Sequence, residues 1–284
     1  MPSFDMMSQQ EGESMEKIDL SNGLEMPSPG FGVFQSKPGQ EAYQAVLWAL
    51  EAGYRHVDTA QIYANEADVG KAIRDSSIPR ESLFLTTKIW NANQGFEAAC
   101  DSFEKSLSQA AVDYFDLLLI HWPQTHTRAD TWKALEKLYE QGKCRSIGVS
   151  NYTSKHLQEM EGYASIKPMV NQVEFSPFLY QKELLDTCRS QGIVLEAYSP
   201  LAQAQKLSHP LLAELGSKFE ASPAQIMIRW SMQKGAVPLP KSVKQGRIQE
   251  NFDVFRFSLS ADDMNLLDKL DEGFRTCWDP SSTE

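Results

Sequence analysis

The chain has 284 residues, 42% hydrophobic and 23% charged, which is typical of a soluble globular protein with one large domain or two ordinary ones. Its net charge of −11 argues against nucleic acid or an anionic membrane as the main partner, while leaving room for a local basic pocket. No window approaches about 18 apolar residues, so the sequence predicts no transmembrane helix.

The N-terminal segment and the cysteines indicate where the chain resides. The first sixteen residues lack the basic and apolar regions of a signal peptide. We expect residues 1–15 to be a disordered tail and residues 16–284 to form a single domain. Four scattered cysteines with no CxxC pair indicate free thiols in a reducing cytoplasm; they are Cys100, Cys144, Cys188 and Cys277.

Short apolar runs alternate with helical patterns along the chain. A small hairpin is expected from Lys17, turning at Asn22-Gly23. The runs expected to be strands are 30–34, 54–58, 83–88, 115–121, 145–150, 168–174, 193–199 and 236–241. Helical patterns are expected to begin at Glu41, Glu66, Gly95, Arg128, Ser154, Gln181, Ser222 and Gly246. Eight strand–helix units predict a (β/α)8 TIM barrel with an N-terminal hairpin cap. A doubly wound open sheet is the rival, but its usual GxGxxG turn is missing.

Polar residues stand where several predicted strands end. Asp58, Lys88 and His121 end three successive strands, and Tyr63 follows Asp58 by five residues. Each has an ordinary structural explanation, such as a helix cap for Asp58 or a solvent-directed side chain for Lys88. Because catalytic residues of such barrels lie at the C-terminal ends of the strands, their coincidence favours one site.

The chemistry that suits this set is proton transfer to a developing alkoxide. A phenol with a pKa of about 10 is a poor donor at neutral pH, and we expect the Lys88 ammonium to lower the pKa of Tyr63. Asp58 would hold Lys88 charged, and neutral His121 would orient a carbonyl oxygen. A metal site is disfavoured because Lys88 is a poor ligand and no HxH or HExxH occurs.

A second signal lies after the last predicted strand. Lys241, Ser242 and Arg247 surround the start of the helix expected at Gly246, where barrels often bind phosphate. A solvated basic loop is the alternative. In so acidic a chain, the cluster favours an anion site.

At these residues the sequence resembles the aldo-keto reductases, and in particular the compact branch of 2,5-diketo-gluconate reductases and trypanosomatid prostaglandin F synthases. The blocks that carry the resemblance include GYRHVDTAQIYANEADVG, LFLTTKIWN, DYFDLLLIHWP, RSIGVSNY, PMVNQVEFSP and PKSVKQGRIQENF. They span from about Lys17 to about Pro280. The resemblance implies a monomeric barrel that reduces aldehydes and ketones with NADPH, with Tyr63 as general acid in a tetrad with Asp58, Lys88 and His121.

The resemblance also implies a cofactor site. Ser150, Asn151 and Gln172 would hold the nicotinamide amide and Tyr198 would stack on its ring. Lys241, Ser242 and Arg247 would take the 2′-phosphate, which favours NADPH over NADH. The remaining expected cofactor residues are Gly32, Ser199, Leu201, Val243, Glu250 and Asn251. One departure is Ala202-Gln203-Ala204, where many members have glycines, so we expect a stiffer loop.

Substrate contacts are expected from Phe34, Trp90, Trp122 and Trp278, which would make an open, aromatic-walled pocket for a small-molecule carbonyl compound. Aldehydes, methylglyoxal, keto-sugars and prostaglandin endoperoxides all remain candidates. Two other functions stay open: a protein that keeps the cofactor fold without turnover, and an aldolase or isomerase that uses Lys88 as a Schiff base. An Asp58 that keeps Lys88 protonated disfavours the Schiff base.

Overall fold

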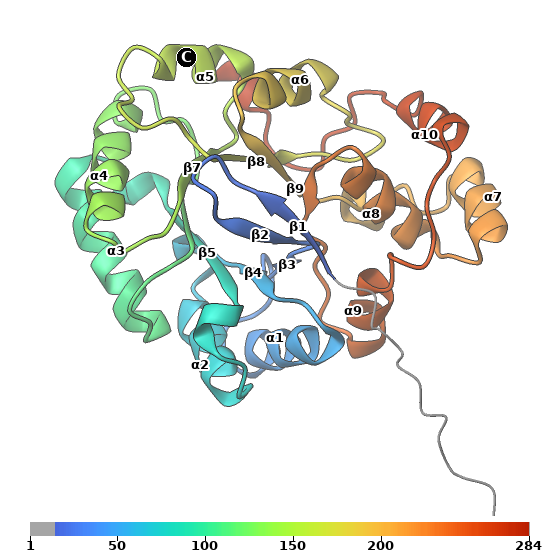
Figure 1. Cartoon of the computed structure of the whole chain (residues 1–284), viewed down its shortest axis with the longest axis horizontal. Helices are drawn as coiled ribbons and strands as arrows, with labels where there is room; N and C mark the ends of the chain where they lie inside the picture. The colour runs from blue at the N-terminus through green and yellow to red at the C-terminus, as the bar shows by residue number, and fades with distance from the viewer. Residues whose placement is uncertain (1–14, 284) are drawn as a thin grey trace, which may run out of the picture.

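A parallel β-barrel forms the centre of the computed structural model, which describes residues 15–283 (Figure 1). The expected tail over residues 1–15 lies outside these residues, apart from Met15. Eight parallel strands pair in the order β10-β9-β8-β7-β6-β5-β4-β3. Their bounds are β3 Phe31–Gly32, β4 His56–Asp58, β5 Phe84–Ile89, β6 Leu117–Ile120, β7 Ile147–Ser150, β8 Val170–Glu174, β9 Val194–Tyr198 and β10 Val237–Pro238. Each lies within or at the edge of a predicted run, and the (β/α)8 prediction is confirmed.

Two backbone hydrogen bonds join the first and last strands of this sheet. Gly30 N donates to Pro238 O at 3.0 Å and Gly32 N donates to Pro240 O at 3.2 Å. The close approach of these two backbone segments requires glycine, because a Cβ on Gly30 would lie 2.6 Å from both the His56 ring and the Leu239 side chain. The ring of strands therefore closes where only glycine fits.

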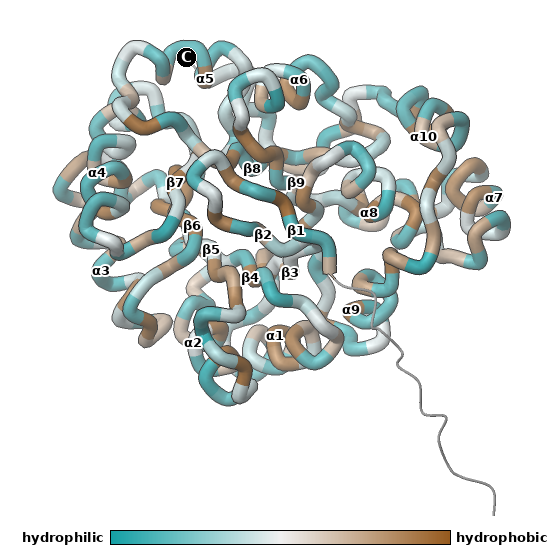
Figure 2. Tube along the Cα trace, viewed as in Figure 1, coloured by the Kyte–Doolittle hydropathy of each residue, from teal (hydrophilic) through white to brown (hydrophobic). Residues whose placement is uncertain are grey.

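Helices surround the barrel, and eight of them begin within three residues of a predicted start. These are α1 Gln40–Ala52, α2 Glu66–Asp75, α3 Phe96–Ala110, α4 Arg128–Glu140, α5 Ser154–Met160, α6 Lys182–Ser190, α8 Pro223–Gln233 and α9 Gln245–Phe252. Two helices were not predicted, α7 (Pro210–Phe219) and α10 (Ala261–Asp268). Figure 2 shows hydrophilic residues on outer parts of α2 and α4 and hydrophobic residues along β8 and β9, as expected when helices cover a sheet.

The predicted hairpin closes the N-terminal end of the barrel. β1 (Glu16–Asp19) and β2 (Glu25–Ser28) pair antiparallel around a turn in which Gly23 has φ 81°. β2 contacts β4 and β10, and the Asn22 side chain donates to Arg145 O at 2.9 Å, just before β7. Figure 1 shows the hairpin crossing the middle of the strand ring. The C-terminal end of the barrel is thus the end left for a site. Within the described residues, no helix has both the length and the apolar character needed to cross a membrane.

Candidate active site

A buried ion pair lies at the C-terminal ends of β4 and β5. Lys88 Nζ lies 2.6 Å from Asp58 Oδ1 and 2.7 Å from Asp58 Oδ2, and it also donates to Thr59 O at 2.9 Å. Lys88 is fully buried and Asp58 is 3% exposed. A charge so deep in the protein requires a partner, and neighbouring parallel strands bring this partner to it.

Tyr63 and His121 complete the cluster from two neighbouring segments. Tyr63 ends a 3-10 turn, η1 (Gln61–Tyr63), and its hydroxyl lies 3.5 Å from Lys88 Nζ. His121 directly follows β6, and its ring lies 5.8 Å from the Tyr63 ring, edge-on at 85°. The structure therefore brings together all four residues that the sequence analysis grouped.

The prediction that the pKa of Tyr63 is lowered is wrong. Burial first, then the charge of Asp58, raises the pKa of Tyr63 well above its usual value. The physical reason is that the phenol is buried near the negative charge of Asp58, while the Lys88 ammonium makes its closest contacts with Asp58 and Thr59 O. The phenol consequently keeps its proton at neutral pH, which is the form that a general acid needs.

His121 is neutral at physiological pH. Burial, followed by the positive charge of Lys88, lowers the pKa of His121 well below its usual value. Its Nδ1 is buried and has no hydrogen-bond partner within residues 15–283. A neutral imidazole can direct one N–H toward a carbonyl oxygen, as the sequence analysis expected.

Two aromatic rings contact this cluster, and a second aromatic pair includes Trp122, which directly follows His121. The Phe34 ring lies 5.1 Å from the Tyr63 ring, and the Trp90 ring lies 5.2 Å from the His121 ring. Trp122 and Trp278 pair edge-on at 6.5 Å, and Trp278 is 76% exposed. These apolar surfaces beside the phenol and imidazole are suited to a carbonyl compound with an apolar substituent.

The ends of β7, β8 and β9 carry a connected set of polar groups. Asn151 Nδ2 donates to His121 O at 3.0 Å and to Ser150 Oγ at 3.1 Å. The Tyr198 hydroxyl donates to Asn151 Oδ1 at 2.8 Å, and Ser150 Oγ donates to Gln172 O at 2.8 Å. The predicted nicotinamide contacts therefore share one hydrogen-bonded network beside the tetrad.

The loop after β9 holds several non-glycine residues in a strained backbone conformation. Ser199, Ala202, Gln203 and Ala204 have φ of 47°, 46°, 49° and 65°, in the left-handed region that glycine favours. Leu201 lies within this loop and packs against the core. Gln203 Nε2 donates to Thr276 O at 3.3 Å, so the loop is fastened to the C-terminal segment.

The segment after β10 and the start of α9 carry basic side chains that are available to bind an anion. Lys241 Nζ donates to Gln35 O at 3.2 Å, whereas Arg247 is exposed and forms no ion pair within the described residues. No side chain caps the α9 N-terminus, and Ser242 Oγ accepts from Lys244 N at 3.1 Å. A free guanidinium beside uncapped helix N–H groups is a donor set that fits a phosphate. The other expected cofactor residues near this edge are Gly32 on β3, Val243 before α9, and Glu250 and Asn251 on α9.

Comparison with known proteins assigns the family. The family model described as "Aldo/keto reductase family" matches residues 30–272. The chain belongs to the aldo/keto reductase family. It is 51% identical to a glyoxal reductase of Bacillus subtilis over 260 residues, 92% of this chain and 94% of the relative. It is 47% identical to a 9,11-endoperoxide prostaglandin H2 reductase of Trypanosoma cruzi over 268 residues, 93% and 95% of the two chains.

A solved structure supports the same assignment. A Bombyx mori aldo-keto reductase in complex with NADP matches with a TM-score of 0.88 and 32% identity, covering 93% of this chain and 95% of that one. The similarity extends over nearly the whole barrel, so the resemblance inferred from short motifs is confirmed.

Sequence reasoning assigned no role to three acidic or basic groups of this aldo/keto reductase. Glu174, at the end of β8, accepts from Thr276 N at 2.6 Å, Thr276 Oγ1 at 2.5 Å and Cys277 N at 3.2 Å. It fastens the C-terminal segment that carries Trp278. Glu196 and His56 lie fully buried inside the barrel. The only signal for them was a charged or ionisable residue inside an otherwise apolar strand.

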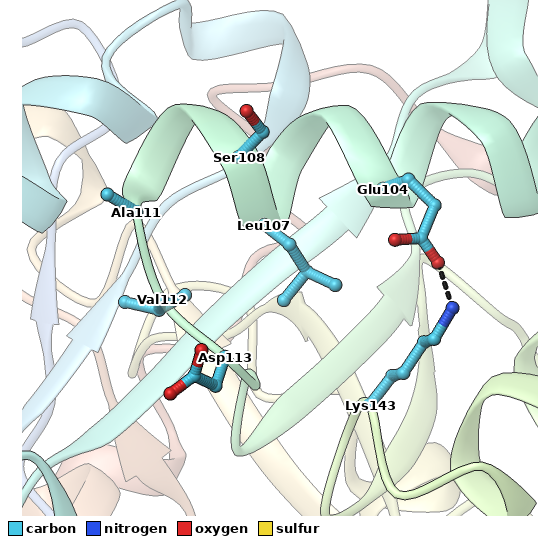
Figure 3. A pocket seen from close by; sticks show the side chains of 7 residues that line it. All are labelled: Glu104, Leu107, Ser108, Ala111, Val112, Asp113 and Lys143. Carbon is cyan, nitrogen blue, oxygen red and sulfur yellow. Dashed lines mark hydrogen bonds and ion pairs between the residues drawn. The ribbon is translucent and has the colours of Figure 1, made fainter.

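A shallow surface pocket of about 440 Å³ lies elsewhere, beside α3 (Figure 3). It is lined by Glu104, Leu107, Ser108, Ala111, Val112, Asp113 and Lys143. Its main polar feature is the Lys143–Glu104 ion pair, whose two side chains are substantially exposed. None of the strand-end residues lines it, so it contributes nothing to the site at the barrel mouth.

Proposed function

We propose that this protein reduces aldehydes and ketones to alcohols with NADPH, and that Tyr63 supplies the proton. The observation that carries the proposal is the Tyr63 hydroxyl lying 3.5 Å from a buried ammonium, beside the neutral ring of His121. NADPH, when bound, supplies the hydride that the carbonyl carbon receives.

The four residues have distinct tasks in this proposal. His121 donates a hydrogen bond to the carbonyl oxygen and aligns it with Tyr63. Tyr63 transfers its proton to the oxygen as negative charge develops there. Lys88 then stabilises the resulting phenolate, and Asp58 keeps Lys88 charged and fixed in place. The same ion pair argues against Schiff-base chemistry, which requires a neutral lysine.

The choice of NADPH over NADH is supported by the unpaired Arg247 and the uncapped start of α9. A 2′-phosphate carries the charge that this donor set would neutralise. The relative of known structure that was solved with NADP is consistent with this choice. Ser150, Asn151 and Gln172 would hold the nicotinamide amide, and Tyr198 would stack on the ring.

The substrate class is supported by the aromatic walls and by the relatives. Phe34, Trp90, Trp122 and Trp278 would contact a small carbonyl compound, and Trp278 leaves the mouth open on one side. The glyoxal reductase relative makes small dialdehydes and 2-oxoaldehydes the first substrates to test. The prostaglandin H2 reductase relative adds an endoperoxide to the panel.

We also propose that the protein works as a cytoplasmic monomer with residues 16–284 as one domain. All four cysteines are free, and Cys144 and Cys188 are buried, as suits a reducing compartment. Size-exclusion chromatography with light scattering should give a mass near 32.0 kDa. A mass of twice that value would overturn the monomer.

The test of the activity is NADPH consumption with a panel of glyoxal, methylglyoxal, 4-nitrobenzaldehyde and prostaglandin H2. We expect at least one carbonyl compound to be converted to its alcohol with one NADPH oxidised per product molecule. NADPH binding without consumption by any compound would contradict the proposal and favour a non-catalytic cofactor-binding protein.

A further inference from the structure

A continuous line of polar groups runs through the interior of the barrel. At the hairpin end, His56 Nδ1 lies 3.1 Å from Pro27 O, and His56 Nε2 lies 3.2 Å from Thr86 Oγ1 and 3.3 Å from Glu196 Oε1. Glu196 Oε2 then accepts from Gln172 Nε2 at 2.9 Å, and the same nitrogen donates to Asp58 Oδ2 at 2.8 Å. The line thus ends at the ion pair behind Tyr63.

The contacts of His56 and Glu196 favour one proton shared between the two side chains. A carbonyl oxygen only accepts, so His56 Nδ1 must carry a hydrogen. If the ring is neutral, its Nε2 lone pair can accept from the Thr86 hydroxyl, but an ionised Glu196 oxygen 3.3 Å away would still repel that lone pair. Glu196 Oε1 has no hydrogen bond as an acceptor within the described residues. A proton on either Glu196 or His56 turns this contact into a favourable one.

The amide of Gln172 is fixed by the two acids. Both of its N–H groups point to carboxyl oxygens, of Asp58 and of Glu196. Its Oε1 is therefore the atom left to meet a ligand at the barrel mouth. Without Glu196, one N–H would lose its partner and the amide could turn over.

We propose that Glu196 is a positioning residue for carbonyl reduction: it holds a proton with His56, orients the Gln172 amide, and keeps the buried cluster around Asp58 and Lys88 electrically neutral. This inference rests on the proposed function. With the proton in place on Glu196, the cluster contains one anion, Asp58, and one cation, Lys88. Loss of that proton leaves a net negative charge behind Tyr63, which disfavours formation of the phenolate.

The charged and titratable groups facing Glu196 agree with this assignment. They are His56 and Asp58 on β4 and Lys88 on β5, while Gln172 faces it from β8. Burial, then the charge of Asp58, raises the pKa of Glu196 to about 8, and burial lowers the pKa of His56 to about 4. Both directions place the shared proton on Glu196 at neutral pH.

The first test reads the proton directly by infrared spectroscopy, without cofactor or substrate. The spectrum of the wild type minus that of Glu196→Gln should contain the carbonyl band of a protonated carboxylic acid at pH 6.5. The band should fade as the pH rises through about 8. If no such band is present at pH 6.5, the inference is overturned. The wild-type titration alone decides this point if the variant does not fold.

The second test compares pH profiles of kcat for a slow carbonyl substrate. Glutamine mimics the protonated acid, since its N–H can donate to His56 and its oxygen can accept from Gln172. We expect wild-type kcat to fall by roughly tenfold between pH 7 and 9. One added buried negative charge should disfavour the Tyr63 phenolate by at least about one pKa unit. Glu196→Gln should lack this fall.

The matched control is Glu136→Gln. Glu136 is a buried glutamate on α4 that accepts from Ser165 N and Ile166 N at 2.7 Å, with no bond to the tetrad. It should keep the wild-type pH profile even if its stability falls. Superimposable profiles for the wild type and Glu196→Gln would overturn the positioning role. A wild type that turns over no carbonyl compound would instead refute the proposed function, and the infrared test would still decide the shared proton.

Discussion

Lys88 is the residue on which the site depends most. It is fully buried, and its ammonium bonds to Asp58 and to the Thr59 carbonyl. Removing one partner of such a pair leaves an uncompensated charge in the interior. Lys88→Met should therefore lower the free energy of unfolding by about 3–5 kcal/mol and abolish turnover.

The double variant Asp58→Asn/Lys88→Met separates the two effects. It contains no buried charge at this position, so most of the lost stability should return while turnover stays absent. Urea denaturation and NADPH consumption measure both quantities on the same samples. Recovery of activity in the double variant would show that the ion pair serves stability alone.

His56 and Glu196 give the free energy of unfolding an unusual pH dependence. Between about pH 4.5 and 6.5 the unfolded chain carries one proton on His56, and the folded protein carries one on Glu196, so the pair contributes no slope. Between pH 6.5 and 8 only the folded protein keeps the proton, because the pKa of Glu196 is raised to about 8. The pair should therefore cost about 2 kcal/mol of stability as the pH rises over this interval.

Glu196→Gln should reverse this dependence. Its folded form binds no proton at this pair, so the loss above pH 6.5 disappears. A loss of about 3 kcal/mol appears instead as the pH falls from 6.5 to about 4.5, where the unfolded chain protonates His56. The measurement is the difference between the denaturation curves of the two proteins at each pH. A difference that is constant with pH would contradict the pKa directions of both groups.

At the scale of elements, the start of α9 should decide between the two nicotinamide cofactors. Arg247 forms no ion pair there within residues 15–283, and a charged hydrogen bond is worth about 1.5–3 kcal/mol. Arg247→Ala should therefore weaken NADPH binding by about 10- to 100-fold and leave NADH binding nearly unchanged. Fluorescence titration measures both affinities. The control is Lys167→Ala, which removes an exposed cation in the segment before β8. Equal losses of NADPH and NADH affinity in Arg247→Ala would refute the 2′-phosphate contact.

Glu174 is one of the side chains that hold the C-terminal segment in place. Glu174 accepts three hydrogen bonds from Thr276 and Cys277, and Trp278 follows directly. Glu174→Gln replaces an acceptor of two backbone N–H groups by an amide that can supply only one acceptor oxygen. We expect faster hydrogen exchange at the Thr276 and Cys277 amides and a several-fold higher KM for carbonyl substrates. Unchanged exchange at these amides would show that Gln203 and Trp122 hold the segment without Glu174.

At the scale of the whole molecule, the sequence predicted what depends on local pattern. Apolar runs such as 115–121 marked strands covered on both faces, and the polar residues at the ends of the second to eighth runs located the barrel mouth. The order of the strands along the chain then brought Asp58, Lys88 and His121 together, since consecutive parallel strands are neighbours.

The features that were missed depend on contacts across the barrel. Glu196 lies in a run of residues that looks like the other predicted strands. Its contact with Gln172 forms only because β8 and β9 pair side by side. The pKa of Tyr63 was predicted in the wrong direction because neither burial nor the sharing of the Lys88 protons can be read from spacing. Helix α7 follows β9 and helix α10 follows α9. Both stand outside the regular alternation of strand and helix on which the prediction relied.

The most direct test of carbonyl reduction by this barrel is the turnover of Tyr63→Phe. The variant keeps the aromatic ring beside Phe34 and His121 but lacks the acidic hydroxyl. We expect NADPH to bind with wild-type affinity by fluorescence titration, and the kcat for methylglyoxal or 4-nitrobenzaldehyde to fall by about 10²–10⁴-fold. A kcat within about threefold of the wild type would contradict Tyr63 as the proton donor.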